Sequence, residues 1–162
     1  MTCRLRPVTD ADEPFLFALR IDPEVAQQSA APAPSREAHA QWFAARPATR
    51  LLYIVEDRPD GVTETPWDRA GMIRLDLTPD ATAWVSLALC PRARGWGYGR
   101  EALGLIEAEA AVHGVRTLHA WIKGANTPSL RCFDAAGYHF VGHVATMRFA
   151  MKELRVAMKE LT

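Results

Sequence analysis

A glycine-rich stretch, Arg92-Ala93-Arg94-Gly95-Trp96-Gly97-Tyr98-Gly99-Arg100-Glu101-Ala102-Leu103, joins a strand-like segment, 82–89, to a helix-like segment, 101–113. Glycines allow the backbone to approach a ligand closely and to take positive φ. The first N–H groups of a helix have no partner within it, and the helix dipole adds partial positive charge there. Arg94 and Arg100 add full charges. The stretch therefore predicts a turn that holds phosphate.

The spacing of the glycines narrows the kind of phosphate ligand. The third glycine of Gly95-x-Gly97-x-Gly99 comes one residue too early for a dinucleotide fingerprint, and no Gly-Lys-Ser/Thr of a P-loop is present. The alternative is a turn that only reverses the chain. Arg94-x-x-Gly97-x-Gly99 resembles the Q/R-x-x-G-x-G/A motif of the GNAT superfamily of N-acetyltransferases, in which this turn binds the pyrophosphate of acetyl-CoA.

A second motif downstream extends the resemblance. The segment Asn126-Thr127-Pro128-Ser129-Leu130-Arg131-Cys132-Phe133-Asp134-Ala135-Ala136-Gly137-Tyr138 is similar to the family's N-x-x-A/S-x(3)-Y-x-x-x-G-F/Y pattern. The two motifs follow in the right order, and the resemblance runs from Leu5 to about Leu154. The chain is therefore identified as a GNAT member, which implies acetyl-CoA as cosubstrate and no metal.

Length and composition fit a single globular domain, 1–162, with 155–162 as a possible tail, and the resemblance implies that it is an N-acetyltransferase domain. Lysine plus arginine equals aspartate plus glutamate at 19 each, so we expect neither nucleic acid nor a membrane as partner. The three cysteines have no metal-ligand or disulfide spacing, and no apolar leader follows the N-terminus. We expect a cytoplasmic protein, and a homodimer is compatible with the sequence.

Periodicity predicts an α/β fold with a mixed sheet of about seven strands and four helices, as the GNAT resemblance implies. We expect strands at 3–8, 51–56, 71–77, 83–89, 117–123, 138–144 and 146–154. We expect helices from Thr9 or Asp10 to Asp22, over 36–46, over 100–113 and from Pro128 to Gly137. Ala150-Met151-Lys152-Glu153-Leu154 recurs as Ala157-Met158-Lys159-Glu160-Leu161, and we expect the first copy to lie in the last strand.

The resemblance implies how acetyl-CoA is held. The strand before the turn splays from its neighbour at a bulge, and its main chain pairs with the pantetheine arm. Phe133 packs beside the thioester. The cofactor-binding residues expected from the resemblance are Leu87, Ala88, Leu89, Arg94, Gly95, Trp96, Gly97, Tyr98, Gly99, Arg100, Asn126, Ser129 and Phe133. Core packing is the alternative role of the Leu87 and Leu89 side chains.

The implied reaction is attack of a neutral amine on the thioester carbonyl, which needs a proton acceptor. The position that often holds a tyrosine acid in relatives is Phe133 here, so that role is empty or passes to another group. We take Asp76 and His119 as candidate bases, because both lie on strands that could face the acceptor. The alternatives are a base that acts through water, a solvated Asp76 and a structural His119.

The N-terminal half is expected to bind the acceptor. Arg20-x-Asp22-Pro23-x-Val25 followed by Glu37-x-His39-x-x-Trp42-Phe43 resembles acetyltransferases of UDP-amino sugars in pseudaminic acid synthesis. The R-x-D-P element also occurs in ribosomal-protein N-terminal acetyltransferases. His39 and Trp42 share one helical face and are our candidates for acceptor binding. Three hypotheses follow: acetylation of an amino sugar or sugar nucleotide, acetylation of protein N-termini, and a non-catalytic acyl-CoA-binding module.

Overall fold

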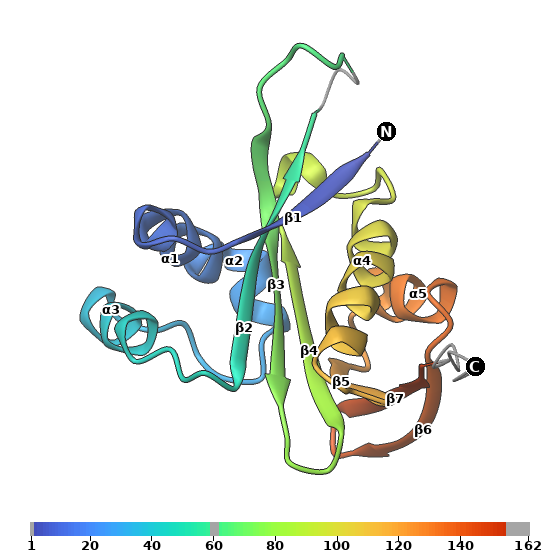
Figure 1. Cartoon of the computed structure of the whole chain (residues 1–162). Coiled ribbons are helices and arrows are strands. Elements are labelled where there is room, and N and C mark those ends of the chain that lie inside the picture. Colours follow the sequence, from blue (N-terminus) through green and yellow to red (C-terminus); the bar gives the residue numbers. More distant parts are fainter. Residues whose placement is uncertain (1, 59–61, 155–162) are drawn as a thin grey trace.

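The computed structural model describes residues 2–58 and 62–154. Within them, seven strands form one mixed sheet, and five α-helices cover its two faces (Figure 1). The strands are β1 (Cys3–Pro7), β2 (Arg50–Asp57), β3 (Asp68–Leu77), β4 (Thr82–Leu89), β5 (Thr117–Lys123), β6 (His139–Val144) and β7 (Met147–Glu153). The helices are α1 (Glu13–Ile21), α2 (Pro23–Gln28), α3 (Arg36–Ala44), α4 (Tyr98–Val112) and α5 (Thr127–Ala135). Short 3₁₀ turns lie at Asp10–Asp12 and Pro91–Ala93.

The sheet order is β1-β2-β3-β4-β5-β7-β6, and β4 and β5 form its one parallel pair among the described strands. That pair is short, because its register ends where Trp84 faces His119. Beyond this point β4 and β5 diverge, while β4 stays in register with β3 up to Leu89. The predicted splay is thus present, but β4 pairs with β3 without the bulge that the resemblance implied.

Alternating strand residues build a core on each face of the sheet. Helices α4 and α5 cover one face, where Ile73, Leu75 and Leu118 pack against Leu103 and Ile106 of α4. Helices α1 to α3 lie on the opposite side (Figure 1), over a smaller core that contains Leu16, Phe43, Leu52 and Ile54. Burial of these apolar side chains fixes which residues of β3 and β4 point toward α1 to α3.

The helices differ from expectation at two places. Helix α4 begins at Tyr98, because Gly97 adopts φ +86° and the Tyr98 side chain turns inward and is 2% exposed. Sequence patterning missed α2, since Asp22-Pro23 was expected to stop a helix. Pro23 instead starts the next one, and Asp22 caps it by accepting a hydrogen bond from Val25 N at 3.1 Å.

The C-terminal part of the chain contains the repeated Ala-Met-Lys-Glu-Leu segment. The first Ala-Met-Lys-Glu-Leu copy lies in β7 up to Glu153, as predicted, whereas the second copy and the expected tail lie outside the described residues. None of the helices that the structure describes is long and apolar enough to cross a membrane.

Candidate active site

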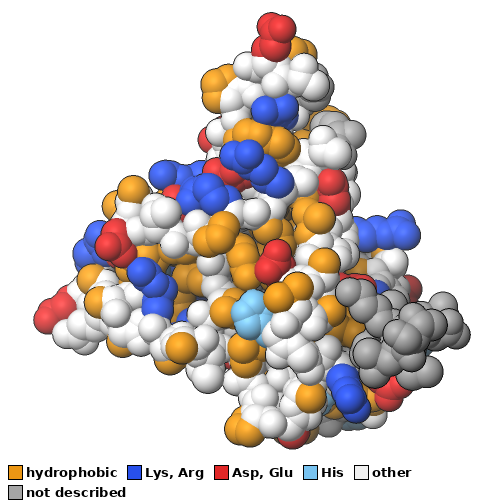
Figure 2. Space-filling model, viewed as in Figure 1, with side chains coloured by type: hydrophobic (Ala, Val, Ile, Leu, Met, Phe, Trp, Pro, Cys, Tyr) orange, Lys and Arg blue, Asp and Glu red, His pale blue; other side chains and the backbone are white. Residues whose placement is uncertain are grey.

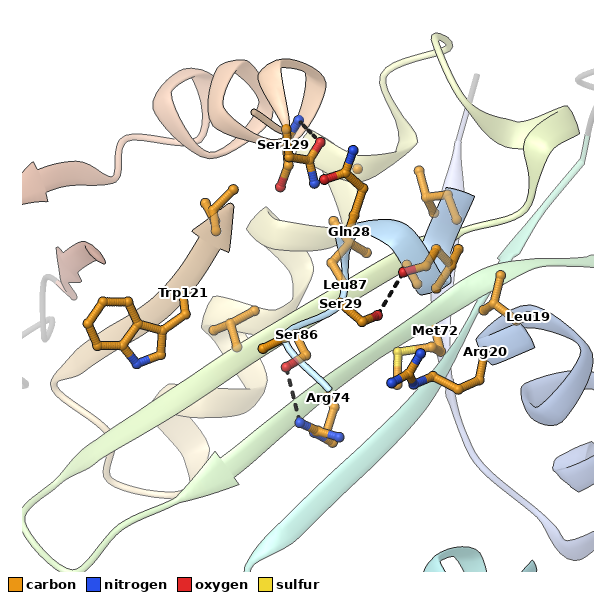
Figure 3. A pocket seen from close by; sticks show the side chains of 18 of the residues that line it. Leu19, Arg20, Gln28, Ser29, Met72, Arg74, Ser86, Leu87, Trp121 and Ser129 are labelled. Atoms are coloured by element: carbon orange, nitrogen blue, oxygen red, sulfur yellow. Dashed lines mark hydrogen bonds between the residues drawn. The ribbon is translucent and has the colours of Figure 1, made fainter. Parts of the chain in front are cut away.

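A cleft of about 1310 Å³ lies where β4 and β5 separate. Its walls come from α1, α2 and α3 on one side and from β3, β4, the glycine turn and α5 on the other (Figure 3). On the face shown in Figure 2, Lys and Arg side chains lie over the half that carries α1 to α3 and over the upper part of the molecule toward the β2–β3 hairpin. The lining of the cleft extends from the glycine turn to α1, α2 and α3, where we expect the acceptor.

The β4 edge lines this cleft through Leu87, Ala88 and Leu89. Pairing with β5 ends at Trp84, so the following part of β4 has no strand neighbour on that side among the strands that the structure describes. The side chains of Leu87 and Leu89 pack against the main core at the same time. An extended ligand could add to this edge as a further strand.

The glycine turn brings Arg94, Gly95, Gly97, Gly99 and Arg100 to the cleft. Two predicted members differ: Trp96 is 60% exposed and Tyr98 is buried, and neither side chain lines the cleft. In this structure, Trp96 and Tyr98 could therefore bind a ligand in the cleft only through their backbone groups.

Arg94 is engaged elsewhere. Its Nε donates to Leu89 O at 3.1 Å, its Nη2 lies 3.2 Å from Asp22 Oδ1, and its Nη1 pairs with Glu24. In this structure its guanidinium therefore ties α2 to the turn.

Helix α5 contributes Asn126, Ser129 and Phe133 to the cleft. Asn126 caps this helix, because its Oδ1 accepts a hydrogen bond from Ser129 N at 3.3 Å. Phe133 is buried against Tyr138 in an edge-to-face pair with ring centroids 4.8 Å apart. Burial raises the pKa of Tyr138, whose hydroxyl has no hydrogen-bond partner among the described residues, so Tyr138 serves as a core aromatic.

The two candidate bases lie in different surroundings. Asp76 lines the cleft, with Oδ1 2.8 Å from Arg50 Nε and Oδ2 2.8 Å from Arg74 Nε. His119 is not among the lining residues and packs edge-on against Trp84 and Phe149, with ring centroids 5.1 and 5.2 Å away. The fold therefore brings Asp76, but not His119, to the cleft wall.

The predicted acceptor residues His39 and Trp42 both line the cleft. His39 is buried, with Nδ1 2.9 Å from Glu13 Oε1, and its ring lies 5.4 Å from that of Trp42. The guanidinium of Arg50 lies 5.2 Å from the Trp42 ring. The part of the cleft around His39 and Trp42 therefore combines aromatic rings with the guanidinium group of Arg50.

Sequence reasoning missed several lining residues, namely Arg20, Arg74, Trp84 and Trp121. A signal existed for Arg74, because it alternates with the apolar residues of β3 and so had to face α1 to α3 or solvent. Arg20 carried no such signal. In the part of the chain that the structure describes, no group of three or more His, Cys, Asp or Glu side chains could hold a metal ion.

Comparisons with known proteins agree with this geometry. Residues 3–139 match the family described as Acetyltransferase (GNAT) domain. YwnH of Bacillus subtilis (strain 168), a proposed phosphinothricin acetyltransferase, is 30% identical over 134 residues, which cover 78% of each chain.

Solved structures share the fold. A proposed phosphinothricin N-acetyltransferase has a TM-score of 0.76 at 24% identity, covering 96% of this chain and 100% of its own. The aminoglycoside acetyltransferase AAC(6')-Ib in complex with coenzyme A and kanamycin has 0.76 at 13%, covering 94% and 95%. The chain belongs to the GNAT acetyltransferase family and is an N-acetyltransferase that uses acetyl-CoA.

Proposed function

We propose that this enzyme acetylates the primary amine of a small acceptor, an amino sugar or a sugar nucleotide. The observation that carries the proposal is the composition of the acceptor side of the cleft. Trp84 and Trp121 both line it and stack with ring centroids 5.8 Å apart and an interplanar angle of 9°. Aromatic faces pack against sugar rings and bases, and arginine forks match phosphate oxygens.

On the other side of the cleft we propose that acetyl-CoA lies along β4. The pantetheine arm would pair with the main chain of Leu87 to Leu89, and the backbone N–H groups of 95–100 would hold the pyrophosphate. The lining of the cleft by β4, the glycine turn and α5 supports this placement. Asn126, Ser129 and Phe133 would then flank the arm and the thioester.

The reaction we propose is direct transfer. The amine nitrogen attacks the thioester carbonyl carbon, a C–N bond forms, and the oxyanion collapses with cleavage of the C–S bond. The CoA thiolate leaves, and the amine proton passes to a base. Asp76 is the candidate that lines the cleft, acting directly or through water, and His119 is the second candidate. A backbone N–H near Leu87 to Leu89 would stabilise the oxyanion.

The test follows CoA release from acetyl-CoA with a thiol reagent. The acceptors are UDP-amino sugars, free amino sugars, polyamines and N-terminal peptides. Turnover with an amino sugar or its nucleotide supports the proposal. Turnover confined to peptides would instead assign the enzyme to protein N-termini, and acetyl-CoA binding without turnover on any amine would contradict the proposed acceptors.

The base is tested with matched variants in the same assay. We expect Asp76→Asn to lower kcat about 100-fold or more with little change in the acetyl-CoA KM, because general base catalysis contributes roughly 10²–10⁴-fold. His119→Gln serves as the comparison, since its ring lies outside the cleft lining. A kcat that falls for His119→Gln and not for Asp76→Asn would reverse the two assignments.

A further inference from the structure

Positive charge exceeds negative charge on the acceptor side of the cleft. Arg20 of α1 and Arg74 of β3 line it, and Arg50 of β2 lies behind Asp76. Asp76 faces two of these guanidinium groups at 2.8 Å. The other acid in the lining, Glu24, is paired with Arg94. The arginine cluster is therefore only partly neutralised by the protein.

Two of these arginines have N–H groups that make no hydrogen bond within the described chain. Arg74 Nη2 donates to Ser86 Oγ at 3.2 Å. Its buried Nε lies 2.8 Å from Asp76 Oδ2 but makes no hydrogen bond of acceptable geometry within the described chain. Arg20 Nη2 donates to Ala31 O and Pro32 O at 2.8 and 3.0 Å, whereas its buried Nη1 has no protein partner within the described chain. Both guanidinium groups are therefore held at one end. A buried donor without an acceptor is unfavourable, and an oxyanion would satisfy it.

The electrostatics of the cluster agree with this geometry. Burial is the largest cause of the lowered pKa of Arg74. The charges of Arg50 and Arg20 lower this pKa further, whereas Asp76 raises it. Burial also lowers the pKa of Arg20. A bound anion would relieve both the desolvation and the mutual repulsion.

The cluster lies beside the segment where the thioester is placed. Arg74 pairs in register with Ser86, the residue before Leu87 on β4. Figure 3 shows Met72 and Arg74 on the strand wall that also carries Ser86 and Leu87, with the side chain of Arg20 reaching toward Met72 from α1. An anion bound there would thus be on the same small molecule as the reacting amine.

We propose that Arg20 and Arg74 form a subsite for an oxyanion carried by the acceptor, a carboxylate or a phosphate-type group. This inference rests on the proposed acetylation of a small amine and deepens it. A carboxylate would come from an amino-acid-like acceptor and a phosphate from a sugar nucleotide. Guanidinium forks bind both in the same way, so the two sources are separated by experiment.

The first test compares acceptors in charged and neutral pairs. The pairs are a UDP-amino sugar with its free amino sugar, and L-methionine with L-methioninol. We expect the charged member to react faster. Arg20→Gln and Arg74→Gln should lower its kcat/KM about 10- to 100-fold, as for loss of a charge-assisted hydrogen bond. For Arg20→Gln, the neutral member and the acetyl-CoA KM should change less than about threefold. Arg74→Gln also loses the ion pair to Asp76, so for this variant the measured quantity is the fall in the ratio of charged to neutral kcat/KM.

Arg46→Gln is the matched control. Arg46 has a side chain 29% exposed, against 26% for Arg74, and also has a buried Nη1 without a protein partner among the described residues. It does not line the cleft. We expect this variant to treat both members of each pair as the wild type does. Equal losses for charged and neutral acceptors in Arg20→Gln and Arg74→Gln would overturn the subsite.

A second test needs no turnover. With saturating CoA to fill the phosphate turn, inorganic phosphate and succinate are titrated by calorimetry. We expect binding to the wild type and to Arg46→Gln, and at least tenfold weaker binding to Arg20→Gln and Arg74→Gln. Preference for phosphate favours the sugar-nucleotide source, and preference for succinate the amino-acid-like one. Unchanged anion binding in both variants would refute the subsite even if the enzyme acetylates amines.

Discussion

At the scale of single residues, buried charges are the groups whose environment has the clearest consequences. Asp12 is 1% exposed and accepts hydrogen bonds from Arg6 Nη1 and Nη2, both at 2.9 Å, and from Thr9 N at 2.8 Å. The hydrogen bonds from Arg6 lower the pKa of Asp12 from 3.8 to about 2. The ionised carboxylate therefore stabilises the fold fully above about pH 4, and this contribution disappears as the pH falls through 2.

The first prediction concerns Asp12→Asn. We expect the free energy of unfolding at pH 7 to fall by about 2–3 kcal/mol, because the shifted pKa corresponds to roughly that stabilisation. Urea unfolding at pH 7 and near pH 2 measures it, and the difference from wild type should shrink at the lower pH. Asp10→Asn is the control, since Asp10 is exposed and should contribute little. A pH-independent loss would show that packing, not charge, is responsible.

The second prediction compares two glycines of α4. A Cβ on Gly99 would lie 2.9 Å from Cys132 Sγ of α5, whereas a Cβ on Gly104 would meet nothing within 4 Å. We expect Gly99→Ala to destabilise by about 1–3 kcal/mol through overpacking. Gly104→Ala should stabilise by about 0.5–1 kcal/mol, because alanine loses less entropy in a helix. Thermal unfolding of both variants checks this, and equal effects would contradict the close approach of α4 and α5.

At the scale of elements, the start of α5 combines a structural and a proposed binding role in one residue. Asn126 Oδ1 caps the helix through Ser129 N, and the residue also lines the cleft where we propose that the pantetheine arm lies. Aspartate keeps the cap acceptor but has no N–H₂ donor. The two roles can therefore be separated by substitution.

The third prediction uses this difference. We expect Asn126→Asp to retain the wild-type melting temperature while its acetyl-CoA affinity falls about tenfold. Asn126→Ala should lose both affinity and about 1 kcal/mol of stability. Calorimetric titration with acetyl-CoA and thermal unfolding make the two measurements. If Asn126→Asp binds acetyl-CoA as tightly as the wild type, the residue only caps α5.

At the scale of the whole molecule, α2 is tied across the cleft by long side chains. It has no buried residue, yet Arg94 of the glycine turn reaches Asp22 and Glu24, and Lys123 Nζ of β5 donates to Gln27 O at 2.6 Å. One wall of the cleft is therefore held mainly by polar contacts to the parts that diverge after Trp84. Such segments belong to the least stable part of a fold.

The fourth prediction follows from this tie. Arg94→Ala should speed hydrogen exchange over 23–28 at least several-fold, because the cation that links α2 to the turn is gone. Mass spectrometry of exchange, with and without acetyl-CoA, measures it. Arg92→Ala is the control, since Arg92 binds Asp57 and Asp68 away from α2. Unchanged exchange in α2 would show that its other contacts suffice.

Much of the fold could be read from local pattern. Strand β5 was predicted with the observed bounds, and the alternation over 71–77 correctly placed the apolar side of β3. The strand–glycine–helix order was predicted at the observed place in the chain, and the glycine turn lines the cleft. Strand periodicity and glycine conformation are local properties, so these features need no knowledge of distant residues.

Other features depend on residues that are far apart in the chain. Helix α2 had a local signal, Asp22 at the N-cap and Pro23 at the first helical position, but it was interpreted as a helix stop. Three features had no local signal: the inward turn of Tyr98, the tie of Arg94 to Asp22 and the convergence of Arg20 with Arg74. Each depends on strand register, on burial or on contacts between distant segments. The order of strands, glycine turn and helices is thus specified along the sequence, because it comes from local backbone preferences and patterning. The composition of the cleft comes from tertiary packing, because only the folded sheet brings distant charges together.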